Sequence, residues 1–176
     1  RLLVHAVEAA VAAGFDAVEL CTTPDAGHPL FQQLQQQHRL ALDAQGDGDL
    51  GARMQGALAR ALQTHEHALL IGSDLPGLDA ACLRSAAAAL ADHDAVFVPA
   101  LDGGYGLVGL RRPAPQLFEG MAWSTPQVMQ HTRKRARAAG LRWAELPALA
   151  DIDEPDDLRH LPAAWFEGLG LQHPAS

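Results

Sequence analysis

The sequence predicts an α/β domain, a three-layer Rossmann-like fold built around a mostly parallel sheet. Two observations predict it. Segments with helical periodicity alternate with short apolar runs, and most of these runs are continuously hydrophobic, which is typical of parallel strands buried on both faces. A chain of 176 residues is long enough for one such domain with a full core.

The first half of the chain shows three helix–strand repeats. The first helix has Leu3, Val7 and Val11 on one face and ends at Gly14. A strand over residues 17–21 follows it. The next two repeats are a helix over 29–37 with a strand over 40–42, and a helix over 50–63 with a strand over 68–71.

The second half contains one departure from this alternation. Asp79 is a good N-cap for an Ala-rich helix that ends at Leu90, and a strand over 95–98 follows. The chain then passes directly into a second β-like run over 105–110, which indicates a hairpin or a strand switch. We expect a helix capped by Ser124 and ended by Gly140, a last strand over 141–146, and a polar stretch over 151–157.

The composition excludes several classes of protein. The 13 Lys and Arg against 21 Asp and Glu give a net charge of −8, which argues against a nucleic-acid or anionic-membrane binder. No apolar run approaches the roughly 20 residues of a membrane span. Cys21 and Cys82 form no CxxC pair, so neither a disulfide framework nor a zinc site is predicted, and we expect a cytoplasmic protein.

Acidic residues follow three of the predicted strands. Asp74 comes after 68–71, Asp102 after 95–98, and Asp151 and Asp153 after the last strand. Ligands of open parallel sheets bind at the carboxyl ends of the strands, where these residues would meet. Grouped carboxylates repel one another unless a cation joins them, so we expect Mg²⁺ or Mn²⁺ carrying a phosphate. Taken singly, each acid could equally be a turn or cap residue.

Two further motifs are given structural interpretations. The stretch from Gly104 to Gly109 reads GxGxxG, but it lies inside a β-like run and opens no helix, so we reject a dinucleotide-binding site there. The basic group Arg133, Lys134, Arg135 and Arg137 could grip phosphate, but its place in the last turns of a helix favours an interaction with the helix dipole.

Five blocks of sequence together resemble one family. They are GDLGARM from Gly48, IGSDLPGL from Ile71, DGGY from Asp102, WST from Trp123 and DIDEPDDL from Asp151. In this order they resemble the DUF2064 family of bacterial proteins with the GT-A (nucleotide-diphospho-sugar transferase) fold. That family is similar to the molybdenum-cofactor guanylyltransferases and the phospholactate guanylyltransferases.

The resemblance implies roles for individual residues. Asp74 and Asp102 would be catalytic, and Asp74, Asp151 and Asp153 would hold the metal. The loop from Gln45 to Asp49 would touch the base and ribose, while residues 102–105 and 123–125 would line the acceptor side. The residues expected to contact the nucleotide or acceptor are Gln45, Gly48, Asp49, Gly51, Ser73, Gly103, Gly104, Tyr105, Trp123, Ser124 and Thr125.

The resemblance also implies a function and one departure from the family. The expected function is a glycosyltransferase or nucleotidyltransferase that uses a nucleotide or nucleotide-sugar, a divalent metal and a small-molecule acceptor, without nucleic acid or a membrane span. The family opens with a strand and a phosphate loop of the form Pro-x-Pro-Gly-x-x-Lys-Thr-Arg-Leu. We expect residues 1–176 to form a single domain that lacks both. The alternative is a non-catalytic nucleotide-binding or assembly module.

Overall fold

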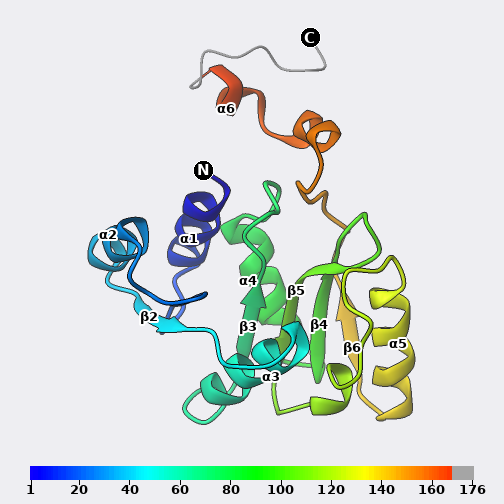
Figure 1. Ribbon diagram of the computed structural model, residues 1–176. Coiled ribbons are helices and arrows are strands. Elements are labelled where there is room, and N and C mark those ends of the chain that lie inside the picture. The colour runs from blue at the N-terminus through cyan, green and yellow to red at the C-terminus, as the bar shows by residue number, and fades with distance from the viewer. Residues whose placement is uncertain (168–176) are drawn as a thin grey trace.

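A computed structural model of the chain describes residues 1–167. Helices and strands alternate along the chain as the sequence predicts (Figure 1). The elements are α1 (Leu2–Ala13), β1 (Glu19–Thr22), α2 (Pro29–His38), β2 (Ala41–Ala44), α3 (Leu50–Ala61), β3 (Ala68–Ile71), α4 (Ala80–Ala89), β4 (Ala95–Pro99), β5 (Tyr105–Leu110), η1 (Pro115–Leu117), α5 (Val128–Ala138), β6 (Trp143–Glu145), η2 (Pro155–His160) and α6 (Ala163–Glu167).

The described strands form two sheets. Strands β1 and β2 pair in parallel as a small sheet, while β3, β5, β4 and β6 form the main sheet in that order. In the main sheet β4 and β6 are parallel, and β5 runs antiparallel to both of its neighbours, β3 and β4. Strands β3, β4 and β6 therefore share one direction, and their carboxyl ends lie at one edge, which we call the rim.

Strand β5 is the departure that the sequence indicates. It joins β4 through a short turn and pairs with it from Ala95 opposite Leu110 to Pro99 opposite Tyr105. The connection is a hairpin. Because β5 also pairs with β3, from Ala68 opposite Leu110 to Ile71 opposite Leu107, it holds β3 and β4 apart.

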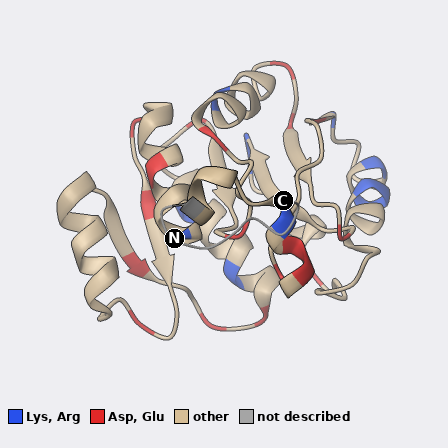
Figure 2. Ribbon diagram, turned by 90° about the horizontal axis from the view of Figure 1, so that it is seen from above, with Lys and Arg blue, Asp and Glu red and all other residues tan. Residues whose placement is uncertain are grey.

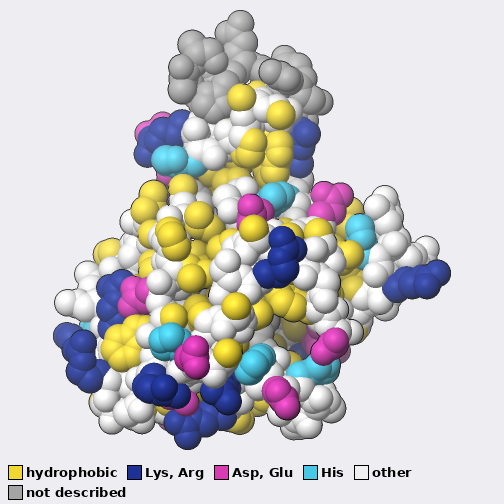
Figure 3. Space-filling view, turned by 180° about the vertical axis from the view of Figure 1, so that it is seen from behind, with side chains coloured by type: hydrophobic (Ala, Val, Ile, Leu, Met, Phe, Trp, Pro, Cys, Tyr) yellow, Lys and Arg dark blue, Asp and Glu magenta, His cyan; other side chains and the backbone are white. Residues whose placement is uncertain are grey.

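The main sheet is covered on both faces, which gives the three layers expected of a Rossmann-like α/β fold (Figure 1). On one face, Phe97 packs with Leu58 of α3, with Met129 of α5 and with Phe118, which follows η1. Ala9 of α1 and Leu83 of α4 pack against Val96 on the other. Figure 3 views the molecule from behind and shows hydrophobic side chains spread among polar ones over that side of the molecule.

The glycines of β5 fit this close packing. A Cβ on Gly106 would collide with Leu75, and one on Gly109 would meet Leu69 and Val96. Both glycines let side chains of the neighbouring strands and of the segment after β3 lie against the backbone of β5. The GxGxxG pattern therefore lies in a buried strand, which confirms the structural interpretation.

The segment after β6 crosses to the start of the chain. Trp165 of α6 accepts a hydrogen bond at its backbone carbonyl from the Arg1 guanidinium at 2.7 Å, and its ring lies edge-on to the His5 ring at 5.2 Å. Phe166 beside it is buried. In Figure 1 this helix lies beyond the amino-terminal end of α1.

The structure corrects two of the predicted elements, and it describes only part of the predicted domain. Ser124 does not cap α5: it has a positive φ of 58°, and the helix begins at Val128 with Gln127 at its N-cap. The last strand is shorter than expected, Trp143–Glu145, because only these residues pair with β4. The final residues 168–176 of the predicted single domain lie outside the described part. Across residues 1–167, no helix has the length and hydropathy needed to span a bilayer.

Candidate functional site

Three carboxylates meet at the rim. Asp102 follows β4, and Asp151 and Asp153 follow β6; one carboxylate oxygen from each lies within 4.8 Å of the other two. Asp102 and Asp153 are exposed and Asp151 is partly buried. The structure thus brings together acids that are separated by about fifty residues in the chain, as expected from the shared direction of β4 and β6.

Asp74 joins this group from the end of β3. Its backbone carbonyl accepts a hydrogen bond from the Ile152 amide at 3.0 Å, which ties the chain after β3 to the segment between Asp151 and Asp153. Burial raises the pKa of the Asp74 carboxyl, and the negative charges of Asp153 and Asp102 raise it further. These mutual effects show that the four acids act on one another electrostatically.

The turn between β4 and β5 fixes Asp102. The Gly104 amide donates a hydrogen bond to Asp102 Oδ1 at 2.7 Å. Gly103 has a φ of +96°, and a Cβ there would collide with the Pro126 carbonyl. The Gly103 carbonyl in turn accepts a hydrogen bond from the Met129 amide at 2.9 Å, so the first turn of α5 holds the backbone of the acidic turn.

A capping box holds the segment of Asp153. The Asp157 carboxylate accepts hydrogen bonds from the amides of Asp153 at 3.2 Å and Glu154 at 2.9 Å. These bonds lower the pKa of Asp157. Burial raises the pKa of Asp151, and the neighbouring charges of Asp102, Asp153 and Asp74 add to that rise. Asp157 therefore stabilises the local backbone, whereas Asp151 belongs to the group of mutually repelling carboxylates at the rim.

An aromatic pair lies next to the acidic turn. The rings of Tyr105 and Trp123 meet edge to face with centroids 6.4 Å apart. Gly51 lies against this pair, because a Cβ there would come within 2.8 Å of both Trp123 Nε1 and the Phe118 carbonyl. The Tyr105 hydroxyl and Trp123 Nε1 are both buried and have no hydrogen-bond partner among residues 1–167. Two polar groups thus stand unsatisfied beside the site.

The other predicted binding residues have local structural roles. Asp49 caps α3 by accepting a hydrogen bond from the Ala52 amide at 2.8 Å, and Gly48 precedes it with a φ of +98°. Gln45 extends the small sheet, since its amide donates to the Thr22 carbonyl at 2.7 Å. Thr125 Oγ1 donates to the Ala122 carbonyl at 2.9 Å.

None of the contacts within residues 1–167 connects Gln45, Gly48 or Asp49 with the four acids. Ser73 is exposed directly before Asp74, and Ser124 is exposed directly after Trp123. The roles in nucleotide or acceptor binding that the resemblance implies for these residues remain predictions.

The donor set at the rim suits a hard divalent cation. Mg²⁺ and Mn²⁺ prefer carboxylate oxygens, and the three grouped carboxylates offer them from two segments. No Lys, Arg or His among residues 1–167 forms an ion pair with Asp74, Asp102, Asp151 or Asp153. Figure 2 shows the molecule from above, with the Asp and Glu segments in red spread over several loops and helices and the Lys and Arg segments in blue including neighbouring turns of α5.

Comparison with known families decides the relationship of this chain. Residues 6–125 match the model of the family described as "Uncharacterized protein conserved in bacteria (DUF2064)". The chain belongs to this family. The family assignment confirms the resemblance to the DUF2064 family; four of the five sequence blocks lie within the matched residues, and the block from Asp151 lies after them. No protein of curated function matches the chain.

Solved structures extend the comparison beyond the DUF2064 family. A candidate nucleotide-diphospho-sugar transferase from Desulfovibrio desulfuricans G20 is 31% identical, with a TM-score of 0.78 over 90% of this chain and 71% of its own. A CMP:2-keto-3-deoxy-manno-octonic acid synthetase complexed with CTP is 15% identical, with a TM-score of 0.60 over 88% and 83%. Rv0371c from Mycobacterium tuberculosis H37Rv is 18% identical, with a TM-score of 0.57 over 90% and 81%. The last two show the likeness of fold alone.

Two features of the site were missed by sequence reasoning. The Asp74–Ile152 backbone bond depends on a contact between distant segments and leaves no side-chain pattern. Whether the Tyr105 hydroxyl finds a hydrogen-bond partner depends on the residues that surround the ring. The position of Tyr105 beside Asp102-Gly103-Gly104 was the available signal for the second feature.

Proposed function

We propose that this chain binds a nucleotide or nucleotide-sugar together with a divalent metal ion at the rim, and transfers its nucleotidyl or glycosyl group to a small-molecule acceptor in the cytoplasm. The observation that carries the proposal is the meeting of Asp102, Asp151 and Asp153 within 4.8 Å, with Asp74 coupled to them. The 31% identical candidate transferase supports the class of reaction.

Asp102, Asp151 and Asp153 would hold the metal. Asp74 would be a further ligand or a general base at the same rim. A bound Mg²⁺ or Mn²⁺ supplies Lewis-acid stabilisation of negative charge on phosphate oxygens. The hydrogen bonds from Gly104 to Asp102 and from the Ile152 amide to Asp74 fix these segments before ligand arrives. Such preorganisation lowers the cost of assembling the site.

Tyr105 and Trp123 would contribute an apolar wall next to Asp102. Both rings are partly buried, and their unpartnered polar atoms can bond to a ligand that reaches them. Since aromatic rings present flat apolar surfaces with a polar handle, this wall suits a base or a sugar of the donor or the acceptor. Gly51 leaves the room that the Trp123 indole occupies.

Ligand-dependent unfolding tests this proposal. The chain would be melted with nucleoside triphosphates and nucleotide-sugars, each with Mg²⁺, with Mn²⁺ and with chelator. A ligand at 100 times its dissociation constant stabilises by about 2.7 kcal/mol, and we expect the shift only with metal present. The variant Asp153→Asn should weaken it, while the matched control Asp156→Asn, an exposed acid after the rim, should leave it unchanged.

The products distinguish the two forms of transfer. Release of pyrophosphate from a nucleoside triphosphate identifies nucleotidyl transfer, whereas release of a nucleoside mono- or diphosphate from a nucleotide-sugar identifies glycosyl transfer. If no ligand shifts the melting temperature in a metal-dependent way while the chain still unfolds cooperatively, the proposed function is wrong.

A further inference from the structure

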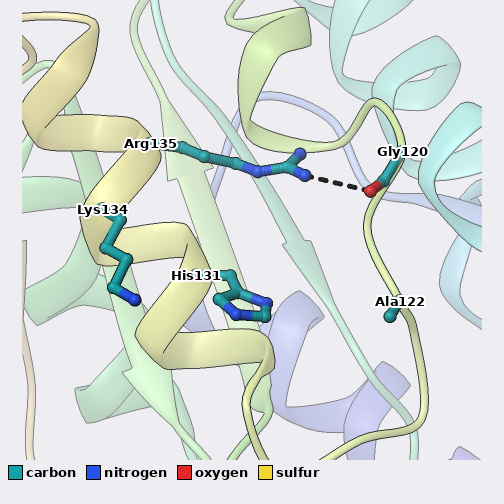
Figure 4. A pocket seen from close by; sticks show the side chains of 5 residues that line it. All are labelled: Gly120, Ala122, His131, Lys134 and Arg135. Carbon is teal, nitrogen blue, oxygen red and sulfur yellow. Dashed lines mark hydrogen bonds between the residues drawn. The ribbon is translucent and has the colours of Figure 1, made fainter.

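A cavity separate from the acidic rim lies between α5 and the loop before it. It has a volume of about 310 Å³ and is lined by Gly120, Ala122, His131, Lys134 and Arg135. Figure 4 shows the three side chains of α5 extending from the helix, with Gly120 and Ala122 on the loop opposite. Residues spaced by three and four positions share one helix face, so the helix presents all three basic groups together.

Arg135 is fixed in this cavity by backbone oxygens. Its Nη1 donates to the Glu119 carbonyl at 2.5 Å and the Gln116 carbonyl at 3.3 Å, and its Nη2 donates to the Gly120 carbonyl at 3.1 Å (Figure 4). These partners are neutral. Arg135 therefore has a fixed orientation, and no carboxylate among the described residues lies within ion-pair distance of it.

The neighbouring basic residues of α5 are used differently. Arg133 forms an ion pair with Glu145 at 2.7 Å, and the Arg137 guanidinium lies 5.9 Å from the centre of the Trp143 ring. Within residues 1–167, the side chains of Lys134 and His131 make no ion pair or hydrogen bond. The helix thus directs Arg133 and Arg137 towards β6, and its unpaired basic groups towards the cavity.

The helix dipole does not account for His131 in the cavity. His131 lies in the first turns of α5, close to the positive amino-terminal end, where a basic group gains nothing from the dipole. The expectation of a dipole role fits Arg135 and Arg137 by position, since both lie in the last turn. In Figure 3, Lys and Arg side chains gather at the lower corner of the molecule on the α5 side.

We propose that this cavity binds the phosphate group of a small ligand, at a site distinct from the metal-binding rim. The Lys134 ammonium and the His131 imidazole can both donate hydrogen bonds to phosphate oxygens. Arg135 adds a fixed positive charge that attracts the anion, although backbone carbonyls already take three of its hydrogen bonds. The cavity volume reaches the lower end of the range for small-ligand sites. The rim has the opposite charge, so without a metal it repels the same ligand.

The single lysine of the chain gives a selective probe. Because Lys134 is the only lysine, reductive methylation with ¹³C-formaldehyde labels only Lys134 and the amino-terminal amine and keeps both positive. Inorganic phosphate would be titrated by NMR at constant ionic strength with chelator present, so that no metal occupies the rim. We expect the Lys134 signal to shift to saturation while the amino-terminal signal does not saturate.

Variants test which groups bind the ion. His131→Gln should weaken phosphate binding about three- to tenfold, as expected for the loss of one hydrogen bond. The matched control Arg137→Gln removes a charge from the same helix outside the cavity, so the affinity should stay within about twofold. A non-saturating Lys134 shift, an equal shift with chloride, or equal affinity in His131→Gln would each overturn the proposal.

A second measurement needs no label. Phosphate at constant ionic strength should raise the melting temperature of the parent chain but not that of Lys134→Gln. An equal rise in both would show that phosphate acts elsewhere. Acetate serves as the carboxylate comparison, and stabilisation by acetate as strong as that by phosphate would replace the phosphate assignment with a carboxylate one.

Discussion

The backbone amide of Ile152 donates a hydrogen bond of 3.0 Å to the backbone carbonyl of Asp74. This bond joins the chain after β3 to the segment after β6, which are otherwise separated in the main sheet by β5 and β4. It holds Asp74 beside Asp151 and Asp153 without using any carboxylate oxygen.

Amide hydrogen exchange should report this bond. We expect the Ile152 amide to exchange at least about tenfold more slowly than an unprotected amide, because exchange requires the bond to open. Addition of Mg²⁺ or Mn²⁺ should slow it further by joining the flanking carboxylates. NMR-detected exchange at fixed pH measures both effects, and exchange at the rate of an unstructured peptide would contradict the contact.

Asp74→Asn should stabilise the metal-free fold at neutral pH. Burial and the charges of Asp153 and Asp102 raise the pKa of Asp74, so its contribution to stability is complete below the unfolded-state pKa of about 3.9 and is lost as pH rises through the folded-state pKa. The ionised group is therefore destabilising at pH 7. Removing the charge should add only about 0.5–1 kcal/mol, because Asp74 is partly buried and solvent screens its charge.

Urea unfolding at several pH values measures this effect. The gain in Asp74→Asn should shrink as the pH falls, because the parent carboxyl then becomes protonated. The same variant should lose metal-dependent stabilisation by nucleotide. Asp156→Asn is the control for an exposed carboxylate. A parent chain that is more stable than Asp74→Asn at pH 7 without metal would contradict the electrostatic account.

Gly103→Ala should destabilise the fold more than Gly14→Ala. Both glycines have positive φ, +96° and +76°, but only a Cβ at Gly103 meets other atoms, the Pro126 backbone. Left-handed strain alone costs about 1 kcal/mol, which we expect for Gly14→Ala. The added overlap should bring the cost for Gly103→Ala to about 2–4 kcal/mol. Equal losses in chemical denaturation would show that the turn moves away from Pro126 without cost.

The Arg133–Glu145 pair should make a small pH-dependent contribution to stability. Hydrogen bonds and charge from Arg133 lower the pKa of Glu145, so the contribution is present above the unfolded-state pKa of about 4.3 and is lost as pH falls through the folded-state pKa. The side chains are 42% and 27% exposed, so we expect only about 0.5–1 kcal/mol.

Glu145→Gln tests that contribution. The difference in unfolding free energy between the variant and the parent should be present at pH 7 and vanish near pH 3. A double-mutant cycle with Arg133→Gln isolates the pair from the Trp143 Nε1 hydrogen bond, which also reaches Glu145 Oε1 at 2.9 Å. A coupling energy that does not change between pH 7 and pH 3 would contradict the assignment.

The sequence pattern predicted those helices and strands whose first and last residues are fixed by neighbouring residues in the chain. Strands β3 and β5 begin and end at the predicted residues, because their apolar runs are bounded by Gly, His and Arg. Asp79 and Gly14 cap helices as expected. The predicted start of α5 was wrong. Ser124 is a residue type that favours the N-cap, but the first turn of the helix is held by the hydrogen bond from the Met129 amide to the Gly103 carbonyl.

The candidate site was predictable where topology alone decides it. The acids meet because β3, β4 and β6 share a direction, so the residues that follow these strands lie at one rim. The division into two sheets was not predicted, since strand pairing is a long-range property without a local signal. The basic cavity was missed for the same reason: it requires the loop at Gly120 to lie against His131 and Lys134.

The hairpin of β4 and β5 has a consequence for the order of folding. It is the only local strand pairing among the described strands, so its closure costs the least chain entropy, whereas β3–β5 and β4–β6 pairings close long loops. We expect the Asp102–Gly104 turn to be formed in the transition state. Gly103→Ala should then slow folding more than it speeds unfolding. The turn that carries an acid of the rim would also be a nucleus on which the main sheet assembles.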